Sequence, residues 1–416
     1  MSQLALHGGT PVRTDPFPAR RLFGPDEKAT VVEMFDRAAA EGSHVLGYSG
    51  PEEEAYCREF AESMGGGFAD GVNSGTNAVW VALRALELEP YGEVVVPAVT
   101  DPGGIMPVVL SGLIPVVADS MPGHYNVGPE QVEARLSERT RAIILAHITG
   151  HPIDLDPIME MARHRGIPVI EDCAQAHGAT YKGKPLGTFG QVAAFSTMFG
   201  KHHATAGQGG LVYTQDEALY WKVRQVADRG KPFGIDNPQG NVVASLNCNM
   251  DELGASIGRV QLKRLPEMVA IRRRHARRMQ AECEARLETV RVLGDPPFGE
   301  SAYWFLFFNV DVDRLTVDKD GFVEAVSAEG VPLSGTYKII PSQYPWFTER
   351  RAIGPQGCHW PWSEAPVDVP REFDLPNAEA NDRTICRILL HEGWSDREVD
   401  DTVAALEKVE RALKKK

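Results

Sequence analysis

Cysteine is scarce in this sequence and never occurs in the arrangements that bind metals or build disulfide frameworks. The six cysteines are scattered at positions 57, 173, 248, 283, 358 and 386, and no two of them form a CxxC pair. Zinc sites and small disulfide-rich folds both depend on closely spaced cysteines, so this spacing argues against either. We therefore expect no metal site, and we expect free thiols in a protein of the reducing cytoplasm.

Long apolar runs are also absent. No window approaches the roughly 18 apolar residues that a membrane-spanning helix requires. The segment from Met1 to Gly9 has no basic stretch followed by an apolar one, which is the pattern of a signal peptide. These absences predict a soluble, cytoplasmic protein without a membrane segment.

Positive charge is in deficit, because 43 lysines and arginines stand against 57 aspartates and glutamates, for a formal net charge of −14. A surface of this sign repels nucleic acids and anionic membranes, so we expect neither as a partner. The densest basic cluster consists of Arg272, Arg273, Arg274, Arg277 and Arg278. On a helix these side chains would spread around much of the circumference, and we interpret them as a solvated face rather than a phosphate site.

What the sequence does contain is a repeated alternation of short apolar segments and helical patterns. The short segments are rich in β-branched residues and show little polar alternation, which is typical of strands buried on both faces of a parallel sheet. This order predicts a doubly wound α/β domain with right-handed crossovers. The predicted strands cover residues 68–73, 94–97, 114–118, 142–147, 169–172 and 211–214.

The length of 416 residues exceeds a single ordinary core, so we expect two domains. We assign residues 1–265 to a large domain that begins with a helical segment, and residues 266–416 to a smaller α+β domain. The smaller domain contains an aromatic strand from 303 to 310 and an irregular segment from 337 to 370. Helices are expected at 25–40, 51–64, 78–88, 129–136, 155–165, 215–230, 253–265 and 266–287. Thr214 and Glu217 are spaced as a capping box.

Three stretches carry residues with specific chemistry, and the first is Ser74-Gly75-Thr76-Asn77. It follows a predicted strand and leads directly into a helix. Free backbone N–H groups and the positive end of the helix dipole make such a turn a ready anion site. The alternative is that a serine or threonine here simply caps the helix.

The second stretch is the end of the strand 169–172, where Glu171 and Asp172 follow two apolar residues. Ligands of such sheets bind beyond the carboxyl ends of the strands. A buried carboxylate there can keep a pyridine nitrogen protonated, and a pyridinium ring stabilises a carbanion on the substrate. The alternative is an acid that caps the following helix.

The third stretch, residues 194–210, passes from a strand through Lys201 into a loop of small residues. A lysine in such a loop can hold pyridoxal phosphate as a Schiff base, and Ser196 can offer a hydroxyl to the phosphate. Taken alone, Lys201 is better explained as a solvated lysine before a loop, as most such lysines are. The three stretches together favour a pyridoxal-phosphate site.

With these stretches in this order, the chain resembles the DegT/DnrJ/StrS family of sugar aminotransferases, which use pyridoxal phosphate. The resemblance covers nearly the whole chain and rests on five ordered segments, 74–76, 171–178, 184–190, 195–210 and 247–262. It implies a fold type I transferase with a large doubly wound mixed sheet and a smaller C-terminal α+β domain. It also implies a homodimer in which each active site is completed by the neighbouring chain.

The resemblance assigns roles to individual residues. Lys201 would form the covalent bond to the cofactor, Asp172 would pair with its ring nitrogen, and Gln175 would lie near its ring hydroxyl. The phosphate would be held by Gly75, Thr76 and Ser196, and by Asn247 of the partner subunit.

The sequence departs from the family pattern at several positions. Asp101 stands where the family usually has an aromatic residue that stacks on the cofactor ring. Cys248 and Asn249 replace an aromatic and a basic residue. Two histidines, His202 and His203, follow the lysine where the family commonly has other residues.

The resemblance implies an aminotransferase that moves an amino group from glutamine or glutamate to a keto-sugar or keto-cyclitol, in amino-sugar or antibiotic biosynthesis. The opening segment, residues 4–13, resembles members that aminate cyclitols such as scyllo-inosose, or that make aminohydroxybenzoate. One alternative is a pyridoxal-phosphate-dependent dehydratase or lyase on the same fold, with His202 or His203 as its acid or base. Another is a non-catalytic regulator that binds the cofactor without turnover.

Overall fold

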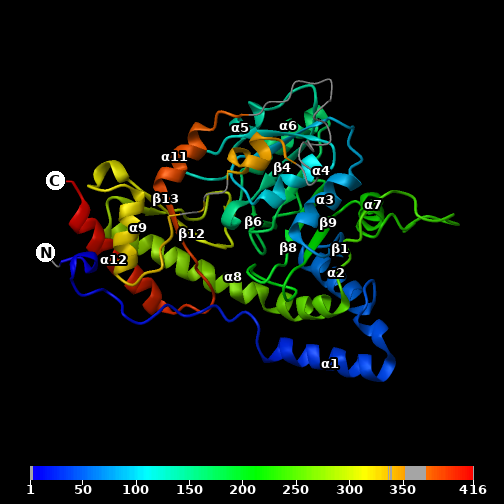
Figure 1. Cartoon of the computed structure of the whole chain (residues 1–416), viewed down its shortest axis with the longest axis horizontal. Coiled ribbons are helices and arrows are strands. Elements are labelled where there is room, and N and C mark those ends of the chain that lie inside the picture. The colour runs from blue at the N-terminus through cyan, green and yellow to red at the C-terminus, as the bar shows by residue number, and fades with distance from the viewer. Residues whose placement is uncertain (1–2, 336, 338–339, 352–371, 416) are drawn as a thin grey trace.

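One seven-stranded sheet with helices packed against it dominates the architecture (Figure 1). The computed structural model describes residues 3–335, 337, 340–351 and 372–415. The strands lie in the order β1-β9-β8-β5-β4-β2-β3. Their bounds are β1 Phe68–Val72, β2 Glu93–Pro97, β3 Ile114–Ala118, β4 Thr140–Ala146, β5 Val169–Asp172, β8 Val192–Ser196 and β9 Gly210–Thr214.

Strand direction makes this sheet mixed. The strands β8, β5, β4, β2 and β3 are parallel neighbours, whereas β9 runs antiparallel to both β8 and β1. The parallel strands are buried along their length, as their continuous apolar sequences require. The predicted α/β fold with a large mixed sheet is therefore confirmed, and all six predicted strands are present.

The sheet separates two hydrophobic clusters, one on each face. Successive strand residues point to opposite faces, so Val94 and Val96 of β2 belong to one cluster and Val95 to the other. Val79 of α3 (Gly75–Ala85) packs in the first cluster and Phe60 of α2 (Pro51–Ser63) in the second. Because both faces of the sheet are covered, its uncovered part is the border at which the strands end.

The helices of the first 230 residues lie where the sequence predicts them, with α4 as an addition. They are α1 Pro25–Glu41, α2 Pro51–Ser63, α3 Gly75–Ala85, α4 Met106–Leu110, α5 Pro129–Glu133, α6 Leu155–Arg165 and α7 Glu217–Ala227. The predicted capping box is wrong: Thr214 ends β9, and the Asp216 carboxylate caps α7 by accepting hydrogen bonds from the N–H groups of Ala218 and Leu219. Within the described residues, none of the helices combines the length and apolar character needed to cross a membrane.

A single long helix, α8 (Glu252–Arg286), runs where the sequence predicts two helices that meet at Pro266. A proline inside a helix removes a backbone hydrogen bond and commonly ends the helix. Here Leu262 and Leu265 before the proline and Met268 after it all belong to one buried cluster, so packing keeps the helix continuous. The predicted domain boundary between residues 265 and 266 falls within this helix, and the two-domain division stays a prediction.

The arginines of α8 do not form the uniformly solvated face that the sequence suggests. Arg272 is 0% exposed. Its guanidinium pairs with Glu392 at 2.8 Å and donates hydrogen bonds to the carbonyls of Tyr303 at 3.0 Å and Leu390 at 2.9 Å. The prediction of a solvated side chain is wrong for Arg272, because α8 packs against a C-terminal segment that carries the Glu392 carboxylate. The spacing of the arginines in the sequence does not reveal this contact.

The C-terminal part contains a second, three-stranded antiparallel sheet in the order β10-β12-β13. Its elements are β10 Val290–Val292, β12 Leu306–Val310, β13 Ile385–Ile388, α9 Lys319–Ala328, α10 Pro345–Thr348, α11 Pro376–Thr384 and α12 Asp396–Leu413. Leu4 joins the hydrophobic cluster of this part, and Figure 1 shows both chain ends beside α12.

A small third sheet is formed by β6 Thr180–Tyr181, β7 Lys184–Pro185 and β11 Gly299–Glu300. Of the predicted irregular segment 337–370, residues 338–339 and 352–370 lie outside the described residues.

Candidate active site

A cavity of about 260 Å³ lies at the carboxyl ends of β5 and β8, beside the start of α3. Parallel strands end at the same edge of a sheet, so side chains that are distant in the sequence meet here. The cavity is lined by Ser74, Gly75, Thr76, Val79, Asp101, Gly103, Gly104, Asp172, Ala174, Ser196, Met198, Lys201 and Gln208. The structure thus brings together five of the predicted site residues, namely Gly75, Thr76, Asp172, Ser196 and Lys201.

The first turn of α3 forms one wall of the cavity. The Ser74 hydroxyl oxygen caps the helix by accepting a hydrogen bond from the N–H of Asn77 at 3.1 Å. The N–H groups of Gly75 and Thr76 have no partner within the helix. A Cβ atom on Gly75 would lie 2.6 Å from that of Ser196, so only glycine lets this turn approach β8 so closely. Ser74 therefore caps α3, and the N-terminus of α3 also faces the cavity.

Glu171, the first acid at the end of β5, has a structural role. It is 0% exposed and accepts hydrogen bonds from the backbone N–H groups of Gly187, Phe189 and Gly190 at 2.7–2.8 Å. It also contacts His147 Nε2 at 3.3 Å. With Cys173 these two residues form a compact buried group, but the Glu171 carboxylate is already fully hydrogen-bonded, so we assign no metal to it.

Asp172, the second acid, lines the cavity. Its Oδ1 atom accepts a hydrogen bond from the N–H of Ala174 at 3.0 Å. Burial raises the pKa of Asp172, while this hydrogen bond and the nearby Lys201 lower it. The alternative role of a helix cap does not apply, because no helix follows β5 directly in the described chain.

Lys201 lies in the turn that joins β8 to β9, and its side chain lines the cavity. The residue is only 7% exposed, and burial lowers the pKa of its amine to about 8, against the raising effect of Asp172 and Asp101. The Nζ atom lies 3.6 Å from the centre of the Trp304 indole ring. A buried amine with this pKa is about half neutral near pH 8, and the neutral form can act as a nucleophile or a base.

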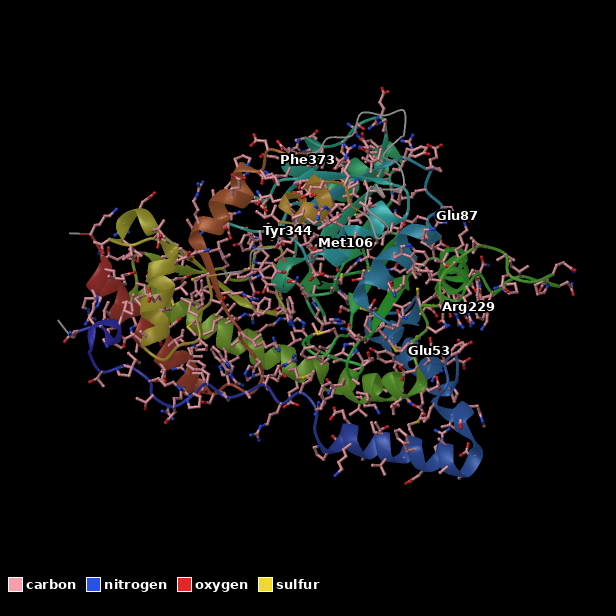
Figure 2. The ribbon with its side chains drawn as sticks, viewed as in Figure 1. Glu53, Glu87, Met106, Arg229, Tyr344 and Phe373 are labelled. Atoms are coloured by element: carbon pink, nitrogen blue, oxygen red, sulfur yellow. The ribbon has the colours of Figure 1, made fainter. Side chains whose placement is uncertain are left out.

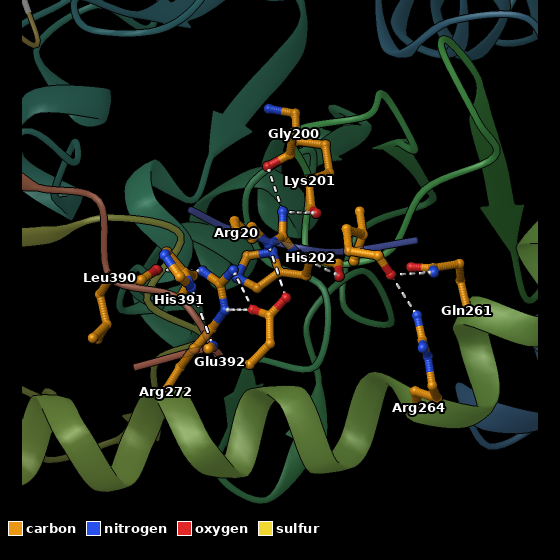
Figure 3. Close-up of polar contacts among 12 residues, drawn as sticks. Arg20, Gly200, Lys201, His202, Gln261, Arg264, Arg272, Leu390, His391 and Glu392 are labelled. Carbon is orange, nitrogen blue, oxygen red and sulfur yellow. Dashed lines mark hydrogen bonds and ion pairs between the residues drawn. The ribbon is translucent and has the colours of Figure 1, made fainter. Parts of the chain in front are cut away.

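Arg20, from the segment before α1, fixes the backbone of the lysine turn (Figure 3). Its guanidinium donates hydrogen bonds to the three carbonyls of residues 200–202 at 3.1, 2.7 and 3.0 Å. Glu392 pairs with Arg20 at 2.9 Å and with Arg272 at 2.8 Å. The segment before α1, the segment that carries Glu392 and helix α8 are therefore linked by these contacts to the backbone on both sides of Lys201.

Gln175 follows the cavity-lining Ala174, and its side-chain amide is fully engaged. Its Oε1 atom accepts a hydrogen bond from the N–H of Thr149 at 2.7 Å, and its Nε2 atom donates to the Tyr337 hydroxyl. Burial raises the pKa of Tyr337. Gln175 thus connects the edge of the cavity to the C-terminal part of the chain.

Asn247 does not line this cavity. It is exposed, and its Oδ1 atom accepts a hydrogen bond from the side chain of Asn249 at 2.7 Å. It ends an arm, defined here as residues 229–247, that projects beyond α7 at the side of the molecule (Figure 1). Within one chain, Asn247 is bridged to Asp228, and its carbonyl oxygen accepts a hydrogen bond from the Asn73 side chain at 3.5 Å.

His202 and His203 follow the lysine, but both are 0% exposed and neither lines the cavity. The Nε2 atom of His202 is 3.0 Å from the carbonyl oxygen of Ala302, and that of His203 contacts the Tyr56 hydroxyl. Burial lowers the pKa of both imidazoles. The hypothesis that one of them is the acid or base of a dehydratase therefore has no geometric support.

Asp101 occupies the cavity wall where an aromatic ring is expected from the family pattern. It is exposed, and its Oδ1 atom accepts a hydrogen bond from the N–H of Gly103 at 2.9 Å. The segment packs tightly, because a Cβ atom on Gly103 would lie 2.3 Å from Thr76 Oγ1. The aromatic ring that contacts Lys201 comes instead from Trp304, on a different segment.

Sequence reasoning misses three residues of the site, Arg20, Trp304 and Tyr337. Trp304 belongs to an aromatic run that the sequence marks only as a strand, and it precedes β12 (Leu306–Val310). Arg20 and Tyr337 come from segments with no motif and no regular period. Each reaches the site through long-range packing, for which the local sequence holds no signal.

The donor set of the cavity fits pyridoxal phosphate. The Lys201 amine, the buried Asp172 carboxylate and the start of α3 suit respectively the aldehyde, the pyridine nitrogen and the phosphate of that molecule. The absence of a side chain at Gly75 lets the helix start approach Ser196, which lines the same cavity. No other group on the cavity wall is an amine among the residues that the structure describes.

Comparison with known proteins agrees with this assignment. A model of the DegT/DnrJ/EryC1/StrS aminotransferase family matches residues 26–407. The chain is 30% identical to the L-glutamine:2-deoxy-scyllo-inosose aminotransferase of Streptomyces fradiae, over 99% of this chain and 98% of that protein. It is also 30% identical to the GDP-perosamine synthase of Caulobacter vibrioides, over 85% of this chain and 88% of that protein.

A solved structure shows the same fold. The aminotransferase from Psychrobacter cryohalolentis is 30% identical to this chain and superimposes with a TM-score of 0.81. The match covers 96% of this chain and 99% of that one.

Proposed function

Because the chain belongs to the DegT/DnrJ/EryC1/StrS aminotransferase family, whose enzymes use pyridoxal phosphate, we propose that it moves an amino group from glutamine or glutamate to a keto-sugar or keto-cyclitol. The observation that carries this proposal is the buried Lys201 amine, which shares one cavity with Asp172 and the start of α3. One relative is named for glutamine and a deoxy-scyllo-inosose and another for GDP-perosamine, which supports both acceptor classes. We place the reaction in cytoplasmic amino-sugar or antibiotic biosynthesis.

Bound pyridoxal phosphate would supply an aldehyde that bonds to amines and a ring that accepts electrons. In this proposal Lys201 provides the amine that holds the cofactor, Asp172 keeps the ring nitrogen protonated, and Gln175 lies near the ring hydroxyl. The phosphate is bound by Gly75, Thr76 and Ser196, and by Asn247 of the partner subunit.

Lys201 also moves the proton in this proposal. Its pKa of about 8 leaves enough neutral amine for Nζ to accept the proton from the α-carbon of the donor, which it would pass to the bound cofactor. In the acceptor half the same amine would take a proton from the cofactor and donate it to the acceptor carbon. Arg20 holds the backbone on both sides of Lys201, so the amine comes back to the same place in each half of the reaction.

The function is tested by following nitrogen into the product. The cofactor-loaded enzyme is incubated with α-¹⁵N-labelled glutamine or glutamate and a panel of keto-sugars and keto-cyclitols, and the products are analysed by mass spectrometry. We expect ¹⁵N in an amine that replaces the carbonyl of one acceptor. Loss of water from an acceptor without any gain of nitrogen would instead identify a lyase and contradict the proposal.

We also propose that the enzyme is a homodimer whose arms cross to the partner. The arm carries exposed apolar side chains, with Ile235 42%, Val242 47% and Leu246 56% exposed. Apolar side chains grouped on a projecting segment are typical of a contact surface. The arm is anchored at its base by Arg229, which donates a hydrogen bond to the Tyr48 hydroxyl at 2.7 Å (Figure 2). Asn247 lies at the same base, bridged to Asp228, so this anchoring also fixes the position from which it would reach a neighbouring chain.

A mixed dimer tests whether Asn247 acts in the partner's site. A Lys201→Ala chain and an Asn247→Asp chain are each expected to be defective as homodimers, since one lacks the amine and the other repels the phosphate. In a mixed dimer one site carries both changes and the other carries neither. Differently tagged, co-purified chains should therefore recover up to about half of the wild-type activity, because independent sites add.

The control for this experiment is Gln239→Ala, which removes another exposed amide from the same arm and should leave the homodimer active. A mixed dimer no more active than its two parents, with dimerisation demonstrated by the tags, would show that Asn247 acts within its own chain or not at all.

A further inference from the structure

The amine of Lys201 rests on an aromatic ring that the sequence does not assign to the site. Its Nζ atom is 3.6 Å from the centre of the Trp304 indole. The same indole donates a hydrogen bond from Nε1 to the carbonyl of Gly200 at 2.8 Å, directly beside the lysine. Trp304 therefore contacts both the reactive end of the lysine and the backbone that carries it.

The ring is presented by a strained and well-anchored backbone. Tyr303, directly before it, has φ of 51°, in the left-handed region that bulky residues rarely adopt. The buried Arg272 donates to the Tyr303 carbonyl at 3.0 Å, and the Trp304 N–H donates to the Thr149 carbonyl at 2.8 Å. Strain of this kind persists only where surrounding contacts impose it, and it concentrates at active sites.

The groups around Lys201 shift the balance between its ammonium form and its neutral amine. Asp172 from β5 and Asp101 from the segment after β2 favour the ammonium form, whereas burial disfavours it. His177 lies near enough to be influenced by Lys201, but burial lowers its pKa to about 4, so it adds no charge near neutrality. An indole face attracts a cation and hardly affects a neutral amine, so it also favours the ammonium.

We propose that Trp304 is a further catalytic residue, whose ring face holds the Lys201 ammonium while the lysine carries the proton that leaves the donor carbon or joins the acceptor carbon. The lysine accepts the proton as a neutral amine, becomes an ammonium against the ring, and is neutral again after it returns the proton. This role rests on the proposed function of Lys201.

The first test measures the amine without the cofactor. Cofactor-free, full-length chains are labelled with a trace of acetic anhydride, which reacts only with neutral amines, from about pH 6 to about pH 10. Removal of the ring in Trp304→Leu should lower the midpoint of Lys201 labelling by about 0.5 to 1 on the pH scale, because the ammonium loses a stabilising contact. Trp304→Phe keeps a ring face and should stay closer to the wild-type protein.

The comparison of leucine with phenylalanine isolates the ring, since both variants lose the hydrogen bond to Gly200. The exposed Lys184 serves as an internal control, and its labelling profile should be the same in all three chains. An unchanged Lys201 midpoint in Trp304→Leu would overturn the proposal. A rise would overturn it as well, because it would mean that the indole acts only by excluding water.

The second test uses the cofactor-loaded enzyme. Trp304→Leu should lower kcat by about 2- to 10-fold with little change in the KM of the donor, and Trp304→Phe should restore most of the loss. A change confined to KM would contradict a role in proton transfer. If the wild-type enzyme shows no transamination, the proposed function fails, whereas the labelling result still decides whether Trp304 holds the Lys201 ammonium.

Discussion

Turnover is expected to fall by about 10⁴-fold or more when Lys201 is replaced by alanine, the upper end of what a general base contributes. The substitution removes the amine that lines the cavity and with it both the covalent anchor and the proton carrier. The phosphate contacts remain, so the variant should still bind pyridoxal phosphate, but reversibly. Borohydride should attach the cofactor to Lys201 in the wild-type protein and leave no covalent label in the variant.

Two controls make this result specific. Lys184→Ala removes an exposed lysine of β7 and should leave both turnover and labelling unchanged. Added small amines should restore part of the activity of Lys201→Ala, since they can occupy the vacated space and carry a proton. A peptide map with the label on Lys182, Lys184 or Lys231, or a variant with more than about a hundredth of wild-type turnover, would contradict the assignment.

Neutralisation of Asp172 is expected to have the second largest effect. Asp172→Asn has nearly the same shape and can still accept the hydrogen bond from the N–H of Ala174, so the fold should be preserved. The variant lacks the charge that would keep the ring nitrogen protonated. We expect kcat to fall by about 10²- to 10³-fold, as for the loss of one preorganised electrostatic contact, while the cofactor stays bound.

Asp101→Asn is the matched control, because it neutralises another carboxylate of the same cavity. Asp101 is exposed, so its charge is screened by water and its loss should cost less than about 10-fold. The variants are compared by kcat and by the affinity for pyridoxal phosphate, measured from its absorbance. Near-normal turnover of Asp172→Asn would mean that another group holds the ring nitrogen.

Much of the site can be read from the sequence because its residues stand next to recognisable strand ends. Ser74 to Thr76, Asp172 and Ser196 each lie where an apolar strand stops, and parallel strands bring such ends to one edge. This rule is independent of side-chain detail, so the sequence alone predicts that these residues meet. The α/β fold is predicted from the apolar, β-branched composition of the strands, which is typical of burial on both faces, whereas the mixed sheet is what the family resemblance implies.

Other features depended on packing between distant segments. The helix α8 continues through Pro266, and Arg272 is buried, because C-terminal and core residues cover them. Helix propensity and residue spacing describe only the local chain, so they predict a helix break at Pro266 and a solvated face that includes Arg272. His202 and His203 were candidates by their position next to Lys201, yet their side chains point into the protein.

The sequence by itself determined the family, the fold and the cavity residues that follow strand ends, because these depend on local patterns and on the geometry of parallel sheets. Only the tertiary structure decided that Arg20 holds the carbonyls beside Lys201 and that Trp304 lies under its amine. These contacts join residues about 100 or more positions apart, through side chains whose direction is set by packing alone. No local period or motif encodes that direction.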